Sequence, residues 1–424
     1  MNKKYINIII FIAFVSFFIA LFFGILSILN YSKVLNPIIK NSFINIPKTR
    51  PIHVTFAISW VFLCSVSIVC EILCEKNKFF LSNFKFIKYS IFFWSLSGFY
   101  ICSSFFLNIF SGKEYIEYNL NSFFLILIGW FFFSYLVLFS NYKNFFFKPI
   151  YIYMWVISSL LFIVSYTELY LTNKDFLEEY QVFNIQIQWK AVGSFVASFN
   201  MLIYGILYYV EEKINKNENY TNSYSAIFFF FISTLNSFTN YTHHTYHIPQ
   251  NMFAKYIGFF VSMLEIIILF NLMKNFKNQK EEIQNNFKKY IKFWIIINLT
   301  LAILISIPII NSVAHGTYVI LAHSMGSLIG IDTYILLYSL YYFKKTKKEK
   351  NVNVKKYLKY LNVSLFIFIF SSILTGFIKN LNDNLFISSI FLNLEIYFKK
   401  IFIFSCLIIT YSLLKILYKI IKWC

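Results

Sequence analysis

The chain has 424 residues, of which 58% are hydrophobic and only 13% are charged. Because a soluble domain carries about 25% charged residues, this composition excludes an ordinary soluble protein and indicates a membrane protein. The formal net charge of +20 would suggest nucleic-acid binding in a soluble chain, but here the lysines lie between apolar runs, where membrane orientation explains them better.

Twelve stretches are apolar and long enough to span a bilayer, which takes about 20 mostly apolar residues. The first begins with Lys3 and Lys4, but it is too long for a signal peptide and lacks a small-residue cleavage site, so we expect an anchor. We therefore predict an all-α polytopic membrane protein in which residues 1–424 form a single transmembrane helical domain. The twelve predicted spans are roughly 5–30, 52–73, 87–111, 121–141, 149–171, 186–210, 223–246, 252–274, 289–312, 314–343, 358–379 and 398–420.

The lysine-rich loops predict the orientation of the chain. Lysines crowd the loops after the eighth and tenth spans, whereas the loops after spans 3, 5, 7, 9 and 11 are short, mixed or acidic. The positive-inside rule then places both termini in the cytoplasm, and we expect a multi-pass protein of the inner (plasma) membrane. The loop after the first span does not fit this orientation, because it carries four basic residues on the predicted outer side. They are Lys33, Lys40, Lys48 and Arg50.

All six histidines fall at one predicted depth, in the outer part of the membrane, although they come from three spans. Ligating side chains within spans are costly and usually functional, so the shared depth favours metal or haem ligands; interfacial histidines satisfied by water remain the alternative. The histidines are His53 on span 2, His243, His244 and His247 at the end of span 7, and His315 and His323 on span 10.

The spacing of these residues limits what they can bind together. His243 and His247 lie four residues apart on one helix face and His244 is adjacent, so two or three of them can converge on one ion. His323 and Met325 are two residues apart and project about 200° apart on a helix. They can therefore face two centres on opposite sides of span 10.

Three motifs, taken together, resemble a known family. They are RPIHVTFAISW at 50–60, NYTHHTYHIP at 240–249 and NSVAHGTYVILAHSMG at 311–326. They resemble the motifs on spans 2, 7 and 10 of the catalytic subunit I of the haem–copper oxidase superfamily. The similarity, over roughly residues 50–340, is to the branch of the cbb-type cytochrome c oxidases and the nitric oxide reductases, whose architecture the twelve spans match.

The resemblance implies two haems b and one copper or non-haem iron. By this resemblance, His53 and Met325 would be the ligands of the low-spin haem, with Met325 standing where the family has a histidine. His323 would be the ligand of the high-spin haem. His315 matches a histidine often found at the start of the span-10 motif. His243 and His244 would hold the non-haem metal.

The sequence departs from the family pattern at span 6. Residues 186–205 contain no histidine where the family has a further ligand of the non-haem metal; Trp189 or Val192 stands near that position. His247 is the candidate replacement. The glutamates of the nitric oxide reductases are also absent from span 6, and Ser237 stands where oxidases of this branch carry a redox tyrosine.

The function implied by the resemblance is that of a terminal oxidase. No CxxCH motif occurs in the chain, so electrons would come from a cytochrome c-type subunit or soluble cytochrome c and pass through haem b to a haem/metal centre that reduces O2 to water. Three alternatives stay open. They are a nitric oxide reductase large subunit converting NO to N2O, a non-catalytic haem-binding electron-transfer subunit, and a transporter or lipid-handling protein without metal.

Overall fold

The computed structural model describes residues 2–31, 45–141, 149–172, 180–216, 221–246, 248, 251–274, 276, 281–344, 352–385 and 389–421. All regular structure in these residues is helical. The predicted fold class, an all-α polytopic membrane protein, is confirmed. The chain divides into two compact units, Met1–Ala20 with Pro47–Ile248 (unit 1) and Leu21–Ile46 with Pro249–Cys424 (unit 2).

Nine helices of the described ranges are long and apolar enough to cross a membrane. The predicted spans 87–111, 223–246 and 252–274 also coincide with helices, but these helices are not among the nine. They are α5 (Lys85–Phe106), α9 (Tyr224–Thr239), and the pair α10 (Met252–Ser262) and α11 (Leu264–Lys274). Each of the last three is shorter than the roughly 20 residues that a hydrocarbon core needs, so twelve spans stay a prediction.

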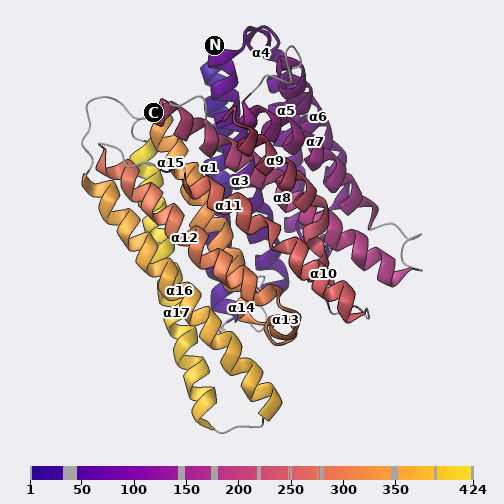
Figure 1. Cartoon of the computed structure of the whole chain (residues 1–424), viewed down its shortest axis with the longest axis vertical. Coiled ribbons are helices and arrows are strands. Elements are labelled where there is room, and N and C mark those ends of the chain that lie inside the picture. The colour runs from indigo at the N-terminus through magenta and orange to yellow at the C-terminus, as the bar shows by residue number, and fades with distance from the viewer. Residues whose placement is uncertain are drawn as a thin grey trace. The chain divides into compact units, whose positions relative to one another are not determined.

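Consecutive long helices of unit 1 alternate in direction. Lys76, at the end of α3, donates to the Tyr151 hydroxyl at the start of α7 (2.9 Å), and Lys88 near the start of α5 lies 4.9 Å from the Tyr5 ring of α1. The helices of this unit begin with the part of α1 (Asn2–Tyr31) up to Ala20. The others are α3 (Ile46–Lys76), α4 (Lys78–Ser82), α5, η1 (Leu120–Ser122), α6 (Phe123–Asn141), α7 (Ile150–Leu171), α8 (Gln181–Asn215), α9 and η4 (Asn240–Thr245). α7 and α8 run side by side (Figure 1).

Aromatic side chains form the core that positions α8 in unit 1. Phe62 of α3 meets the rings of Trp130, Phe162, Phe195 and Phe199 edge-on, at centroid distances of 4.9 to 5.7 Å. Edge-to-face pairs of this kind add about 0.5–1.5 kcal/mol each beyond simple burial. This cluster joins α3, α6, α7 and α8 and fixes the rotation of α8 about its axis.

Unit 2 is built around a helical hairpin and a broken span. The hairpin consists of α16 (Val352–Leu385) and α17 (Ser389–Ile421), which run side by side (Figure 1). The other elements are α10, α11, α12 (Glu282–Ser306), α13 (Pro308–Ala314), α14 (Tyr318–Met325), the π-helix η5 (Gly326–Thr333) and α15 (Tyr334–Lys344).

The ends of two predicted spans differ from the structure, for local reasons. The span predicted over 289–312 begins earlier and ends at Ser306, because Pro308 cannot donate a helical hydrogen bond and holds Ile307 in an extended conformation (ψ 125°). The span predicted over 314–343 is interrupted at its start. Gly316 adopts a φ of +75°, and Thr317 caps a new helix by accepting from the Val319 N–H (3.2 Å).

Candidate haem and metal ligands

His53 lies about two turns into α3, and a backbone carbonyl fixes its tautomer. Its Nδ1 is 2.7 Å from the carbonyl oxygen of Ala20 in α1. That oxygen can only accept, so Nδ1 carries a proton, and in the neutral imidazole the lone pair lies on Nε2. This second-shell arrangement is the usual one for a ligating histidine, so His53 fits the axial ligand of a haem iron.

The loop that follows α5 closes over the same end of α3. Arg50, one turn before His53, donates to Glu117 (2.7 Å) and contacts Glu114 (3.4 Å). Glu117 is buried, and burial raises the pKa of its carboxyl above the ordinary value; the nearby Arg50 guanidinium offsets part of that rise. The ion pair therefore ties the loop to the helix that carries His53.

His244 lies in η4 with its imidazole against Trp189 of α8. The two rings are parallel, with an interplanar angle of 3° and a centroid distance of 5.0 Å. Trp189 thus covers one face of a predicted metal ligand, from the helix where the family supplies a histidine. The backbone of His243 belongs to η4, but its side chain, and all of His247, lie outside the described residues.

The described side chains contain no group of three or more His, Cys, Asp or Glu residues that could hold a metal ion. A non-haem metal usually takes at least three protein ligands in sites of this kind. His244 therefore fits such a metal only in combination with residues beyond the described side chains. The role of His243, His244 and His247 as metal ligands stays a prediction.

The three predicted ligands of span 10 lie in unit 2, at and after the break. His315 is exposed and caps the end of α13, its N–H donating to the Asn311 carbonyl (2.8 Å). His323 and Met325 are both half-buried on α14, before the π-helix. Because His323 and Met325 are two residues apart on one helix, their side chains project in nearly opposite directions.

The imidazole of His323 also fits a ligand role. Its Nδ1 is buried and has no hydrogen-bond partner among the described residues. Leaving a buried polar atom unsatisfied costs about 1–3 kcal/mol, which a bound group at this imidazole would offset. The haem-ligand roles of His53, His323, Met325 and His315 remain predictions, and the environments of His53 and His323 support them.

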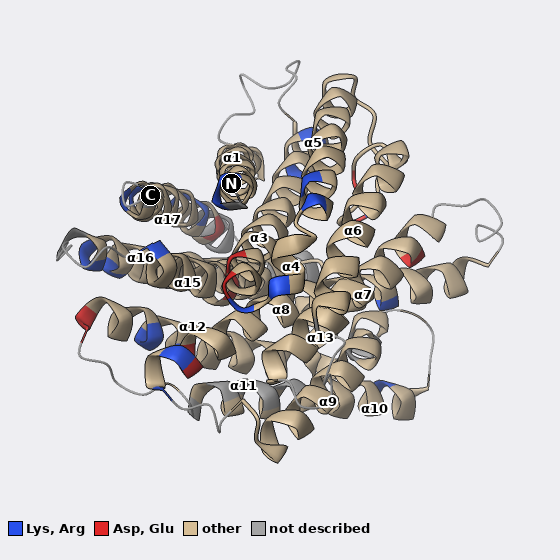
Figure 2. Ribbon diagram, turned by 90° about the horizontal axis from the view of Figure 1, so that it is seen from above, with Lys and Arg blue, Asp and Glu red and all other residues tan. Residues whose placement is uncertain are grey.

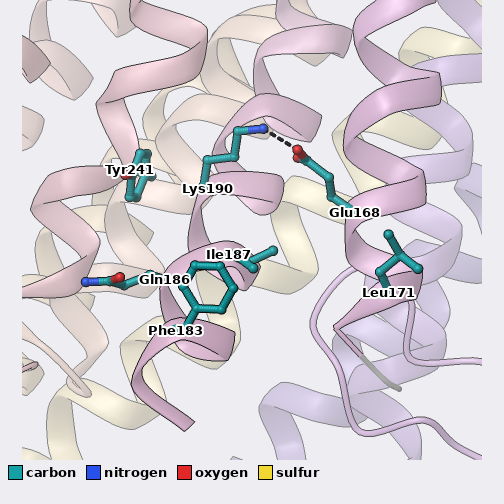
Figure 3. Close-up of a pocket in the computed structure, with 7 residues that line it drawn as sticks. All are labelled: Glu168, Leu171, Phe183, Gln186, Ile187, Lys190 and Tyr241. Carbon is teal, nitrogen blue, oxygen red and sulfur yellow. Dashed lines mark hydrogen bonds and ion pairs between the residues drawn. The ribbon is translucent and has the colours of Figure 1, made fainter. Parts of the chain in front are cut away.

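An ion pair next to Trp189 was not predicted from the sequence. Lys190 of α8 pairs with Glu168 near the end of α7, and both line a cavity of about 490 Å³ with Leu171, Phe183, Gln186, Ile187 and Tyr241 (Figure 3). The sequence does show that Lys190 and Glu168 are charged residues near apolar spans, which marks both as candidates for an ion pair. That they pair with each other could not be predicted, because it depends on how α7 and α8 are rotated about their axes.

Comparisons with known proteins agree with this fold. Residues 4–405 match the family model of cytochrome c and quinol oxidase polypeptide I. A heme–copper terminal oxidase dimer solved by cryo-electron microscopy is similar in structure, with a TM-score of 0.71 at 13% sequence identity, covering 100% of this chain and 84% of that one. No curated protein sequence matches the chain.

The family match covers nearly the whole chain, and the apolar helices make the chain an integral membrane protein. The likeness to the solved oxidase shows that the two chains share a fold; at 13% sequence identity it shows no more than that. The chain therefore belongs to the cytochrome c and quinol oxidase polypeptide I family of the haem–copper oxidase superfamily, a family of membrane oxidoreductases.

Proposed function

We propose that this chain is the catalytic subunit of a respiratory terminal oxidase of the cbb branch, which reduces O2 to water. His53 and Met325 would hold a low-spin haem b, His323 a high-spin haem, and His243 and His244, with His247, a copper or iron ion. Haem iron, when bound, supplies one-electron redox chemistry and an open coordination position for the gas. A cytochrome c-type protein would donate the electrons, and the inner membrane is the proposed location.

The observation that carries the proposal is the fixed tautomer of His53. With Nδ1–H donated to Ala20, the neutral imidazole has its lone pair on Nε2, where it is available to iron as an axial ligand requires. The protein's other contribution is to exclude water around the ligands. The aromatic cluster about Phe62 supports this by packing four helices tightly below the His53 end of unit 1.

One observation favours a second candidate, a haem-binding electron-transfer subunit without a complete second metal site. Trp189 lies flat against His244 from the helix that would otherwise supply the further ligand. An indole offers no lone pair to a metal, since its nitrogen is a donor only. In this alternative the chain would bind haem at His53 and pass electrons without reducing a gas.

An optical spectrum of the purified full-length protein, oxidised, dithionite-reduced and with carbon monoxide, tests both candidates. Pyridine haemochrome and metal analysis give the stoichiometry. The oxidase predicts two haems b per chain, one of which binds carbon monoxide, and about one equivalent of copper or non-haem iron. A single low-spin haem without a carbon monoxide shift would favour the electron-transfer subunit, and no haem would contradict both.

The variant His53→Ala assigns the low-spin haem. We expect it to lose the low-spin bands and one haem per chain while the carbon monoxide-binding haem stays. Ile52→Ala, a half-buried neighbour on the same helix, is the matched control and should keep both haems. Equal haem content in the two variants would contradict the role proposed for His53.

A further inference from the structure

The cavity lined by Glu168 and Lys190 lies near one end of a membrane-spanning helix. α7 has 22 residues and is therefore about 33 Å long, close to the roughly 30 Å thickness of a hydrocarbon core. Glu168 lies within the last turn of α7, so the cavity is at the depth where acyl chains give way to lipid headgroups. All of its lining residues belong to unit 1.

The polar side of the cavity offers both an acceptor and a donor to a ligand. Glu168 Oε1 pairs with Lys190, whereas Glu168 Oε2 is buried and has no hydrogen-bond partner among the described residues. A buried carboxylate oxygen without a donor is costly, so its complement is a group that carries an N–H or O–H. The ammonium of Lys190 has three N–H groups, more than its contact with Glu168 requires.

The charges of Glu168 and Lys190 cancel, so the ligand that fits them best has no net charge. A lone cation would compete with Lys190 for the carboxylate, and a lone anion would meet Glu168 with like charge. A zwitterion instead places its ammonium beside the carboxylate and its anionic group beside Lys190. An ammonium that carries hydrogen also supplies the donor that Glu168 Oε2 lacks.

The other side of the cavity is apolar and open to the bilayer. Leu171, Phe183 and Ile187 form this wall (Figure 3), and the first two are 41% and 55% exposed. Exposed apolar side chains on a membrane-spanning helix face acyl chains, so a lipid can enter the cavity sideways. The cavity volume of about 490 Å³ lies within the roughly 300–1,000 Å³ typical of ligand pockets.

We propose that this cavity binds a zwitterionic phospholipid whose headgroup ends in a primary ammonium, as in phosphatidylethanolamine. The ammonium donates to Glu168 Oε2, and Lys190 donates to a phosphate oxygen. The acyl chains run along the apolar wall of Leu171, Phe183 and Ile187. The proposal goes beyond the oxidase function and does not depend on it, because the binding of this lipid needs no haem or metal.

A lipid in this cavity would contact the element that carries the predicted metal ligands. Tyr241, which lines the cavity, belongs to η4, three residues before His244. Trp189, the neighbour of Lys190 on α8, stacks on His244 at 5.0 Å. The bound lipid would therefore support the packing of η4 against α8.

A series of headgroup analogues tests the hydrogen bond without changing the protein. Phosphatidylethanolamine and its mono- and dimethylated forms carry an N–H, whereas the trimethylated form, phosphatidylcholine, keeps the charges but has none. Native mass spectrometry counts the lipids that the full-length protein retains from nanodiscs containing one analogue and phosphatidylcholine in equal amounts. We expect each form with an N–H to be retained about tenfold more than phosphatidylcholine, the factor that one hydrogen bond to a charged group contributes. Equal retention would overturn the proposal.

Glu168→Gln keeps the shape of the side chain but removes its charge. We expect this variant to lose the preference for phosphatidylethanolamine and, because Lys190 is then uncompensated, to retain the anionic lipid phosphatidylglycerol in its place. Glu395→Gln is the matched control, because Glu395 pairs with Lys399 of α17 at 2.5 Å, outside the cavity, and it should keep the original preference. The same preference in both variants would overturn the proposal.

Phe183→Ala separates the apolar wall from the headgroup contacts. It leaves Glu168 and Lys190 in place, so we expect fewer retained lipids but an unchanged preference for phosphatidylethanolamine. A preference lost in Phe183→Ala as fully as in Glu168→Gln would contradict the assignment of the ammonium to Glu168. If Glu168→Gln does not fold, the analogue series on the unmodified protein decides the matter, and a preference there for phosphatidylglycerol would also overturn the proposal.

Discussion

At the scale of single residues, the burial of Glu117 makes the stability of unit 1 depend on pH. Only 3% of its surface is exposed, and burial raises the pKa of its carboxyl above the ordinary value of 4.5 more than the Arg50 guanidinium lowers it. A folded-state pKa above the unfolded one means that folding favours the protonated form. The contribution of Glu117 to the free energy of unfolding is therefore fully present below about pH 4.5. It is lost as the pH rises through the pKa of the folded state.

The substitution Glu117→Gln should flatten this dependence. A glutamine stays neutral at every pH and its side-chain oxygen can still accept from Arg50. We expect the thermal midpoint of the variant to fall less than that of the unmodified protein as the pH is raised from 4.5 towards neutrality. Glu114→Gln, at the more exposed partner of Arg50, should keep the original slope; a slope that is unchanged in Glu117→Gln would contradict the argument.

Residue-level predictions from the sequence rested on the identity of side chains. The histidines and Met325 were chosen by type and spacing, and their roles as ligands stay predictions; the hydrogen bond of His53 to Ala20 supports one of them. The contacts of Trp189 with His244 and of Lys190 with Glu168 could not be predicted. They join residues 55 and 22 positions apart, and they depend on the rotation of α8, which the Phe62 cluster sets.

At the scale of secondary-structure elements, the π-helix η5 packs closely against α12. A Cβ atom added at Gly330 would lie 2.8 Å from the ring of Trp294, which is fully buried. The large ring cannot move without disturbing the packing around it. Gly330→Ala should therefore destabilise the protein by about 1–3 kcal/mol, the usual cost of overpacking.

Gly98 of α5 provides the control for that prediction, because no atom lies within 4 Å of a Cβ placed there. Alanine is favoured over glycine by up to about 1 kcal/mol inside a helix. Gly98→Ala should thus leave the midpoint of thermal or denaturant unfolding unchanged or slightly raised. A similar shift in both variants would mean that Trp294 does not restrain η5.

Helices were easier to predict than their ends. Long apolar runs identify the spans because a bilayer requires about 20 such residues, and each predicted span coincides with helical structure. The stop before Pro308 was missed, because apolar residues continue through it. The boundary predicted at residue 313 falls a few residues later in the structure, after Ala314, where Gly316 adopts a φ of +75°.

At the scale of the whole molecule, the distribution of basic residues predicts which end of unit 1 faces the cytoplasm. Within the described part of unit 1, eight lysines lie at the Lys76 end and only four basic residues at the His53 end. The first set is Lys3, Lys4, Lys76, Lys78, Lys85, Lys88, Lys213 and Lys216, and the second is Lys48, Arg50, Lys113 and Lys190. Figure 2 shows basic segments on α5 of this unit and on α12 and α16 of unit 2.

Because basic residues accumulate on the cytoplasmic side, we expect the Lys76 end of unit 1 and both termini to face the cytoplasm. Green fluorescent protein fused after Cys424 should fluoresce, and alkaline phosphatase fused there should be inactive. Phosphatase fused after residue 176, in the acidic loop that follows α7, should be active. The reverse pattern would place the His53 end of unit 1, with the predicted ligands of that unit and the Glu168 cavity, on the cytoplasmic side, where a soluble cytochrome c-type donor outside the membrane would have no access to them.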